Sequence, residues 1–199
     1  MAGRPREFDR NQALRQALEL FWARGFETTS MADLVAALGI ASARIYAAFG
    51  SKEALFREAV ELYEADEGGF ADLALHEACA RTAIERMLKD AVTLYTRADR
   101  PWGCMVVSSA VNCSSDNDTV REWLAEHRRA RTASIIQRLA AAVQAGELAP
   151  DTDATSLGDY YSTVLHGLSV QARDGVTQAR LLNGVALAMS VFDAAARKT

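Results

Sequence analysis

The sequence predicts an all-α protein of about nine helices. Apolar residues recur at three- and four-residue spacing along the chain, and no stretch shows the strict alternation of a half-buried strand. Half of the 199 residues are hydrophobic and only three are proline, a composition that favours well-packed helices. The chain length suits one large domain or two small ones.

The first helix is expected to run from Asp9, a good N-cap, to Arg24, with Gly25 ending it. Phe26 should pack back against this helix. Its apolar residues follow one helical stripe, which predicts a brace for the next two helices; they are Ala13, Leu14, Ala17, Leu18, Phe21 and Trp22.

Residues 28–52 predict two short helices joined by a tight turn. Ser30 and Ser42 each place a hydroxyl where it can cap a helix, and Gly39 supplies the turn between the helices. The apolar residues of the two helices are Met31, Leu34, Val35, Leu38, Ile45 and Phe49. The second helix leaves small or polar residues facing outward. This helix-turn-helix arrangement predicts DNA binding.

The net charge of −4 argues against a nucleic-acid partner until its distribution is considered. Residues 1–60 carry eight Lys/Arg and seven Asp/Glu, a net +1, whereas residues 61–199 carry fourteen and nineteen, a net −5. Arg4 and Arg6 form a basic arm that can reach phosphates or a minor groove. The plain alternative is a solubilising tail.

A fourth helix is expected to start at Lys52, capped by Ser51. It should persist into residues 70–75, although residues 64–69 (EADEGG) make a poor helix interior. We place the boundary between a DNA-binding domain (residues 1–50) and a ligand-binding and dimerisation domain (residues 51–199) just before this helix.

The second domain continues as helices. Residues 81–97 form an amphipathic helix, and Cys104–Cys113 is apolar enough for a buried helix, followed by a capping loop at Ser114–Asp118. A long helix should then run to about Ala145. Asp151 or Thr152 is expected to cap a helix through Arg173, and Thr177 opens a last helix through Ala196.

Membrane, secretory and enzyme classes find no support in the sequence. No run of about 18 apolar residues occurs, and residues 1–12 lack the apolar core of a signal peptide. The cysteines have no C-x-x-C spacing, which fits a reducing cytoplasm; they are Cys79, Cys104 and Cys113. The histidines show no metal-ligand spacing; they are His76, His127 and His166. We expect no cofactor, no metal and no catalytic residues.

Two segments, GRPREFD and GFETTSMADLVAALGIASARIYAAFGSKEALF, resemble the DNA-binding domain of the TetR family of bacterial transcriptional regulators. The resemblance covers residues 4–60 and is specific at Gly39, Tyr46, Phe49 and Lys52. WGCMVVSSA and LHGLSVQARDG resemble stretches of the family's second domain. The resemblance implies a homodimer that binds an operator in double-stranded DNA and a small-molecule effector.

The resemblance also implies roles for single residues. The Ser30 hydroxyl and the helix N-terminus beside it would contact a phosphate, and Tyr46 and Lys52 would also contact phosphates. The residues implied to face base edges are Ser42, Ala43 and Arg44. Arg44 suits the O6 and N7 atoms of guanine. The alternatives are a half-buried core role for Tyr46 and a solvated charge for Arg44.

A single recognition helix buries little surface, so we expect two copies on a near-palindromic operator. The residues predicted for dimerisation are Tyr161, Val164, Leu165, Leu168, Leu182, Val185, Met189 and Phe192. The residues predicted to line an effector pocket are Met87, Ala91, Tyr95, Trp102, Met105, Ser109, Asn112, Trp123 and Tyr160. For both sets the alternative is the chain's own core.

The predicted function is a repressor released from its operator when an effector binds the second domain, with the helix at Lys52 as the lever. One alternative is a regulator that senses oxidants or electrophiles through Cys104 or Cys113, which requires a lowered thiol pKa. A more remote alternative is a helical binding protein without DNA function.

Overall fold

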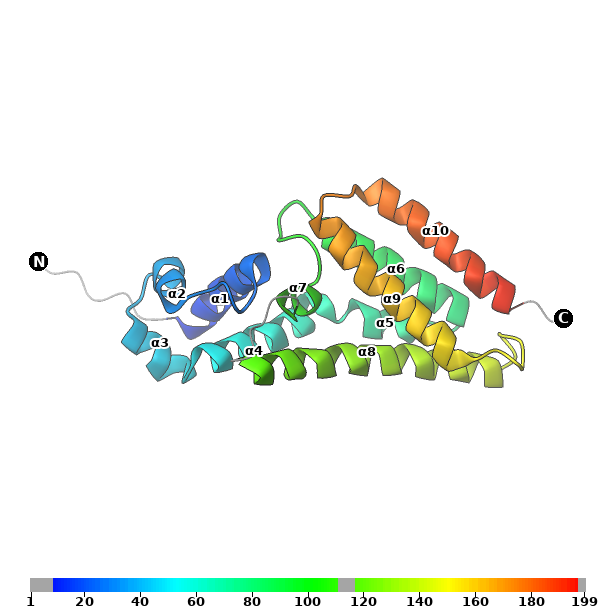
Figure 1. The fold of residues 1–199 in the computed structure, drawn as a ribbon, viewed down its shortest axis with the longest axis horizontal. Coiled ribbons are helices and arrows are strands. Elements are labelled where there is room, and N and C mark those ends of the chain that lie inside the picture. Colours follow the sequence, from blue (N-terminus) through cyan, green and yellow to red (C-terminus); the bar gives the residue numbers. More distant parts are fainter. Residues whose placement is uncertain (1–8, 111–116, 197–199) are drawn as a thin grey trace, which may run out of the picture.

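The computed structural model describes residues 9–110 and 117–196, and every regular element in these residues is helical. Figure 1 shows an elongated molecule with the first three helices at one end and the remaining helices extending to the other. The first group consists of α1 (Arg10–Arg24), α2 (Met31–Leu38) and α3 (Ser42–Phe49). From this group, α4 (Lys52–Tyr63) leads into the rest of the molecule.

The larger group begins with a π-helical turn (Glu64–Gly68) directly after α4. It continues with α5 (Phe70–Leu75), α6 (Ala80–Tyr95), α7 (Met105–Ala110), α8 (Asp118–Gln144), α9 (Ala154–Arg173) and α10 (Gln178–Ala195). The most extensive packing between two helices is that of α8 against α9, and α6 packs against α5, α9 and α10. The all-α prediction is therefore confirmed.

Three predicted helix caps are confirmed. The Asp9 carboxylate accepts hydrogen bonds from two backbone N–H groups in the first turn of α1, at 2.9 and 3.1 Å. Ser51 caps α4 through a 2.9 Å bond from the N–H of Ala54. Ser30 caps α2 and forms a reciprocal capping box with Asp33. These caps depend only on residues within one turn, so the sequence carries them.

Two other predicted caps are wrong. Ser42 is the first helical residue of α3, and the N-cap is Ala41, whose side chain makes no capping hydrogen bond. The cap of α9 is neither Asp151 nor Thr152 but Asp153, whose carboxylate accepts from two backbone N–H groups at 2.9 and 3.1 Å. Helix α3 therefore begins one residue earlier than the hydroxyl pattern predicts, and α9 begins one or two residues later.

The expected fourth helix is divided. The π-helical turn and Gly69 separate α4 from α5, so the described residues hold one more α-helix than the sequence predicts. A Cβ at Gly68 would lie 2.8 Å from Cε1 of Tyr63, so the chain folds back closely onto the last residue of α4. Wider turns of this type occur frequently at functional sites.

An aromatic cluster joins the first three helices to the rest of the fold. Phe56 of α4 packs against Phe21 and Phe26, with ring centroids 5.1 and 5.0 Å apart. Trp22 of α1 lies edge-on to Tyr63 at 4.8 Å. Phe26 therefore packs back as expected, and α1 is fixed to α4 along its length.

Within the described residues no single helix is long and apolar enough to cross a membrane. The pair α2 and α3 reaches that length and composition only jointly, and the two helices meet at 94°.

Candidate functional site

The helix-turn-helix is built as the sequence predicts. Hydrogen bonds from the Ser30 hydroxyl and N–H, together with the Arg24 guanidinium, lower the pKa of the Asp33 carboxyl. That carboxylate thus stays charged at the N-terminus of α2, where a negative charge is favourable. Gly39 has φ +67°, a left-handed conformation that glycine adopts readily. This turn sets the angle between α2 and α3.

The outward face of α3 carries small or polar residues and is accessible. Ile45 and Phe49 point into the core, whereas Ser42, Ala43 and Arg44 are exposed. Tyr46 is 48% exposed, an unusual position for a large aromatic side chain. The structure thus brings together on one face the residues predicted to meet base edges and the tyrosine predicted to meet a phosphate.

Lys52 starts α4 beside this face and is half-buried. Its Nζ lies 4.2 Å from the ring centroid of Phe26, a cation–π distance. Arg10 lies over the Phe49 ring at 4.5 Å and makes an ion pair with Glu58 at 2.7 Å. The sequence analysis did not single out this arginine. Arg4 and Arg6 lie outside the described residues.

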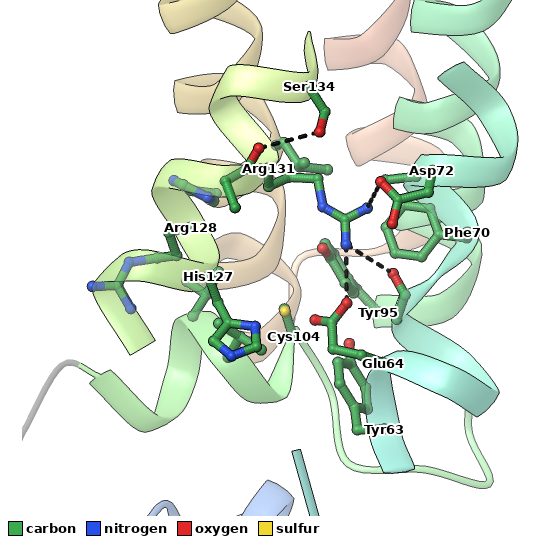
Figure 2. A pocket seen from close by; sticks show the side chains of 17 residues that line it. Tyr63, Glu64, Phe70, Asp72, Tyr95, Cys104, His127, Arg128, Arg131 and Ser134 are labelled. Atoms are coloured by element: carbon green, nitrogen blue, oxygen red, sulfur yellow. Dashed lines mark hydrogen bonds and ion pairs between the residues drawn. The ribbon is translucent and has the colours of Figure 1, made fainter. Parts of the chain in front are cut away.

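A cavity of about 260 Å³ lies inside the second domain. Its wall comes from the end of α4, the π-helical turn, α5, α6, α7, α8 and α9. Figure 2 shows Arg131 reaching across it to two carboxylates. Arg131 pairs with Glu64 at 2.9 Å and with Asp72 at 3.3 Å. Burial raises the pKa of Glu64 despite this arginine.

One end of the cavity carries two phenols and a thiol. Tyr63 and Tyr95 point their hydroxyl ends toward the middle of the pocket, on the side of the Cys104 sulfur (Figure 2). Burial, and then the neighbouring Cys104, raise the pKa of both phenols. Both hydroxyls therefore remain protonated and can donate hydrogen bonds.

Cys104 does not have the environment that a redox sensor requires. It is buried, and burial raises the pKa of its thiol, whereas a reactive cysteine has a lowered pKa. It precedes α7, as expected, but that helix is only six residues long. Cys113 lies outside the described residues. The redox alternative is thus not favoured.

The predicted pocket residues are dispersed. Of that set Tyr95 lines the cavity. Three others are fully buried in the core: Met87, Ala91 and Met105. Four lie elsewhere in the described structure: Trp102, which is exposed, and Ser109, Trp123 and Tyr160. Asn112 lies outside the described residues.

Sequence reasoning missed the polar residues of the cavity, among them Tyr63, Glu64 and Arg131. The poor helix interior at residues 64–69 was the available signal, since the π-helical turn begins there. Arg131 belongs to a charged run that is indistinguishable in sequence from a solvated helix face.

The predicted dimerisation residues mostly face the chain's own core. Six of them are buried within this chain: Tyr161, Leu165, Leu168, Val185, Met189 and Phe192. Val164 and Leu182 are half-buried. The outward face of α9 and α10 carries other apolar residues, among them Val170, Leu187 and Val191 at 46%, 74% and 37% exposure.

Hydrogen bonds fix the end of α1 to the second domain. The Trp22 indole Nε1–H donates to the carbonyl of Gly103 at 2.9 Å, in a buried position. Arg173, at the end of α9, donates to the carbonyls of Trp22 and Ala23 at 3.2 and 2.6 Å. These carbonyls belong to the last turn of α1, which has no helical donors for them.

A set of ion pairs also links α1 to the π-helical turn; we call them the interdomain ion pairs. Arg15 of α1 pairs with Asp66 at 2.9 Å. Arg100 pairs with Glu67 at 3.1 Å and also with Glu19 of α1. A second cavity, of about 250 Å³, lies among these residues. The two halves of the molecule are therefore joined by polar as well as aromatic contacts.

Comparison with known proteins gives consistent matches. The model of the bacterial regulatory proteins of the tetR family matches residues 13–59, and the tetracyclin repressor-like C-terminal domain matches residues 80–181. The HTH-type transcriptional repressor ComR of Escherichia coli (strain K12) is 34% identical over 187 residues, covering 90% of this chain and 87% of that protein. The repressor BdcR of the same organism is 31% identical, covering 94% and 90%.

A solved structure extends these matches. It is a cysteine mutant of the TetR family transcriptional regulator CifR, complexed with 26-bp double-strand operator DNA. It is 40% identical to this chain with a TM-score of 0.89, covering 94% of this chain and 98% of that chain. The similarity therefore spans both the helix-turn-helix and the helices around the cavity.

Proposed function

Because the chain belongs to the TetR family of bacterial regulatory proteins, we propose that it is a transcriptional repressor whose operator affinity a small molecule controls. The observation that supports this proposal most directly is the exposed face of α3, with its small and polar residues, at one end of the molecule. Its similar relatives ComR and BdcR are repressors, and CifR has been solved on operator DNA. The protein acts in the bacterial cytoplasm, where its operator lies.

DNA recognition is assigned to residues 1–50. In the proposed complex α3 lies in the major groove, with Arg44 donating to a guanine. Tyr46 and Lys52 contact phosphates on either side, and the N–H groups at the start of α2 donate hydrogen bonds to a third phosphate. The Ser30 hydroxyl already bonds to Asp33, so this contribution comes from the backbone rather than from the hydroxyl. Arg4 and Arg6 add phosphate or minor-groove contacts.

Residues 51–199 provide dimerisation and effector binding. The protein is a homodimer, and we assign its interface to the outward face of α9 and α10. This face carries Val170, Leu187 and Val191, and Gly167 and Gly184 have no neighbouring atom within 4 Å of an added Cβ. Pairing of two such helix pairs buries these apolar side chains and allows close approach at the glycines. The two α3 helices then meet half-sites about 34–36 Å apart.

The effector site is assigned to the cavity beside Tyr63 and Arg131. It adjoins the end of α4, whose other end adjoins α3. An effector that favours a different placement of α4 changes the spacing of the recognition helices. A difference of about 1–3 kcal/mol in effector affinity between the two states is typical of such coupling, and it lowers operator affinity by the same amount.

The first experiment selects DNA from a random pool with the purified protein and measures affinity for the selected sequence by fluorescence anisotropy. Arg44→Ala is expected to lose about 1–3 kcal/mol on that sequence, with a smaller loss on unrelated DNA. Lys52→Met is expected to weaken binding on all sequences and to reduce the salt slope by about 1 per subunit.

Arg86→Ala is the matched control, because Arg86 is an exposed arginine of α6 in the larger group of helices. Its affinity should equal that of the parent protein. Failure to select any DNA sequence, or equal losses for Arg44→Ala and Arg86→Ala, would contradict the proposed function.

A further inference from the structure

The hydroxyl of Tyr63 is a poorly satisfied polar group in the cavity wall. Tyr63 is fully buried, and within the described residues its hydroxyl has no nitrogen or oxygen hydrogen-bond partner, only the weakly bonding Cys104 thiol beside it. Leaving such a group unmatched in the interior costs free energy, so buried hydroxyls nearly always have a partner. The ring lines the cavity, and its hydroxyl end points into it (Figure 2).

We propose that the cavity binds a small uncharged molecule through a carbonyl oxygen that accepts a hydrogen bond from Tyr63. A carbonyl oxygen has two lone pairs, and the Tyr95 hydroxyl lines the same end of the cavity. Both phenols can therefore donate to one oxygen. An alcohol would add a hydroxyl donor that needs an acceptor of its own. The inference rests on the proposed function, because it names the class of effector.

The charges around the cavity favour a neutral ligand. Glu64 and Asp72 are matched by Arg131, which bonds to both carboxylates, and Arg128 also lines the wall. Two acidic and two basic side chains leave no net charge. His166 remains neutral near pH 7, because burial and the Arg128 charge lower its pKa. An added carboxylate or ammonium group would disturb this balance in a poorly solvated site.

The remainder of the wall sets the size and polarity of the ligand. The wall also contains apolar side chains, among them Phe70, Val106, Val107 and Leu165. The cavity, at about 260 Å³, lies just below the roughly 300–1,000 Å³ of most ligand pockets. A ligand smaller than a typical drug, with one carbonyl and an apolar body, matches this volume.

A ligand on the Tyr63 hydroxyl would act directly at the junction of the two halves. Tyr63 ends α4 and precedes the π-helical turn, and its ring lies edge-on to Trp22 of α1. Fixing the hydroxyl therefore restrains a side chain that contacts both the cavity and the DNA-binding domain. This gives the ligand a physical route to the position of α4.

The test uses the full-length protein and four probes of similar shape: acetophenone, ethylbenzene, benzoate and 1-phenylethylamine. Isothermal titration is expected to show acetophenone binding about tenfold more tightly than ethylbenzene, the difference that one net hydrogen bond makes. Benzoate and the amine should bind more weakly than acetophenone. In Tyr63→Phe the preference of acetophenone over ethylbenzene should disappear.

Tyr161→Phe is the matched control for folding. Tyr161 is equally buried, but its hydroxyl donates to the carbonyl of Ala188 at 3.2 Å. Its loss should lower the Tm while leaving the acetophenone preference intact. Tyr63→Phe should keep or raise the Tm, because it removes a hydroxyl without a nitrogen or oxygen partner.

Three results would overturn the inference: an unchanged preference in Tyr63→Phe, tighter binding of benzoate or the amine, and no binding of acetophenone up to its solubility limit. Operator binding is measured in parallel on the same samples. Loss of probe preference with intact operator binding overturns the ligand assignment alone. Absence of operator binding in the parent protein overturns the proposed function instead.

Discussion

Replacing Trp22 by phenylalanine tests whether the end of α1 is fixed to the second domain by a buried hydrogen bond. The indole is 1% exposed and its N–H donates to the carbonyl of Gly103 at 2.9 Å. Phenylalanine keeps one ring near Tyr63 but has no donor. A buried carbonyl left without its donor costs about 1–3 kcal/mol. Whole Trp-to-Ala truncations cost about 3–5 kcal/mol, so losing one of two rings should cost about 1–2 kcal/mol.

The two contributions together predict a loss of about 2–5 kcal/mol from a total stability of about 5–15 kcal/mol. Urea unfolding followed by circular dichroism measures this loss, and the Tm should fall by roughly 4–20 °C. Trp102→Phe is the matched control: Trp102 is 44% exposed, so its replacement should change stability by no more than about 0.5 kcal/mol. A loss below about 1 kcal/mol in Trp22→Phe, or equal losses in both variants, would refute the role given to this bond.

Three further predictions concern single contacts. Gly158→Ala places a Cβ 2.4 Å from Cγ1 of Ile136. The overpacking costs about 1–3 kcal/mol and outweighs a helix-propensity gain of about 1 kcal/mol. Urea unfolding should therefore show a net loss of stability, and a gain in stability would contradict this reasoning. Burial lowers the pKa of His166 below 6.5. The stability that this residue contributes is therefore present above about pH 6.5 and is lost as the pH falls through its folded-state pKa. In His166→Asn the urea midpoint should fall less steeply on acidification, and an unchanged slope would disprove this. Ser30→Ala should cost about 0.5–2 kcal/mol as a lost N-cap and raise the pKa of Asp33 toward its usual value in an NMR titration, whereas an unchanged pKa would show that the capping box does not hold this carboxylate.

The features predicted well from the sequence are those that depend on neighbouring residues. Ser30, Gly39 and the apolar positions of α2 and α3 act within a few residues of one another, so the helix-turn-helix could be predicted with its outward face. The cavity could not. Glu64 and Arg131 are 67 positions apart in an ion pair, and only the packing of α8 against the π-helical turn brings them together.

The dimer surface shows a different limit. An apolar stripe predicts that a helix face is buried, but it does not distinguish burial by the same chain from burial by a second copy. On α10, Met189 and Phe192 are buried in the chain's own core, whereas Leu187, which lies outside this apolar stripe, is 74% exposed. The opposite face of the same helix is therefore the one left for a partner.

The interdomain ion pairs have a consequence for how operator binding responds to electrolyte. Added salt screens exposed charge pairs over about 10 Å at 0.1 M, and Arg15 and Asp66 are 64% and 43% exposed. Salt thus acts at two places. Its cations compete with the protein's basic side chains for the DNA phosphates, and it weakens the ion pairs that hold α1 to the π-helical turn. The dependence of operator affinity on ionic strength then contains a contribution from these contacts between α1 and the π-helical turn. Arg15→Gln removes one of these ion pairs and no phosphate contact. Operator affinity in this variant should therefore fall less steeply with ionic strength, by the contribution of that pair.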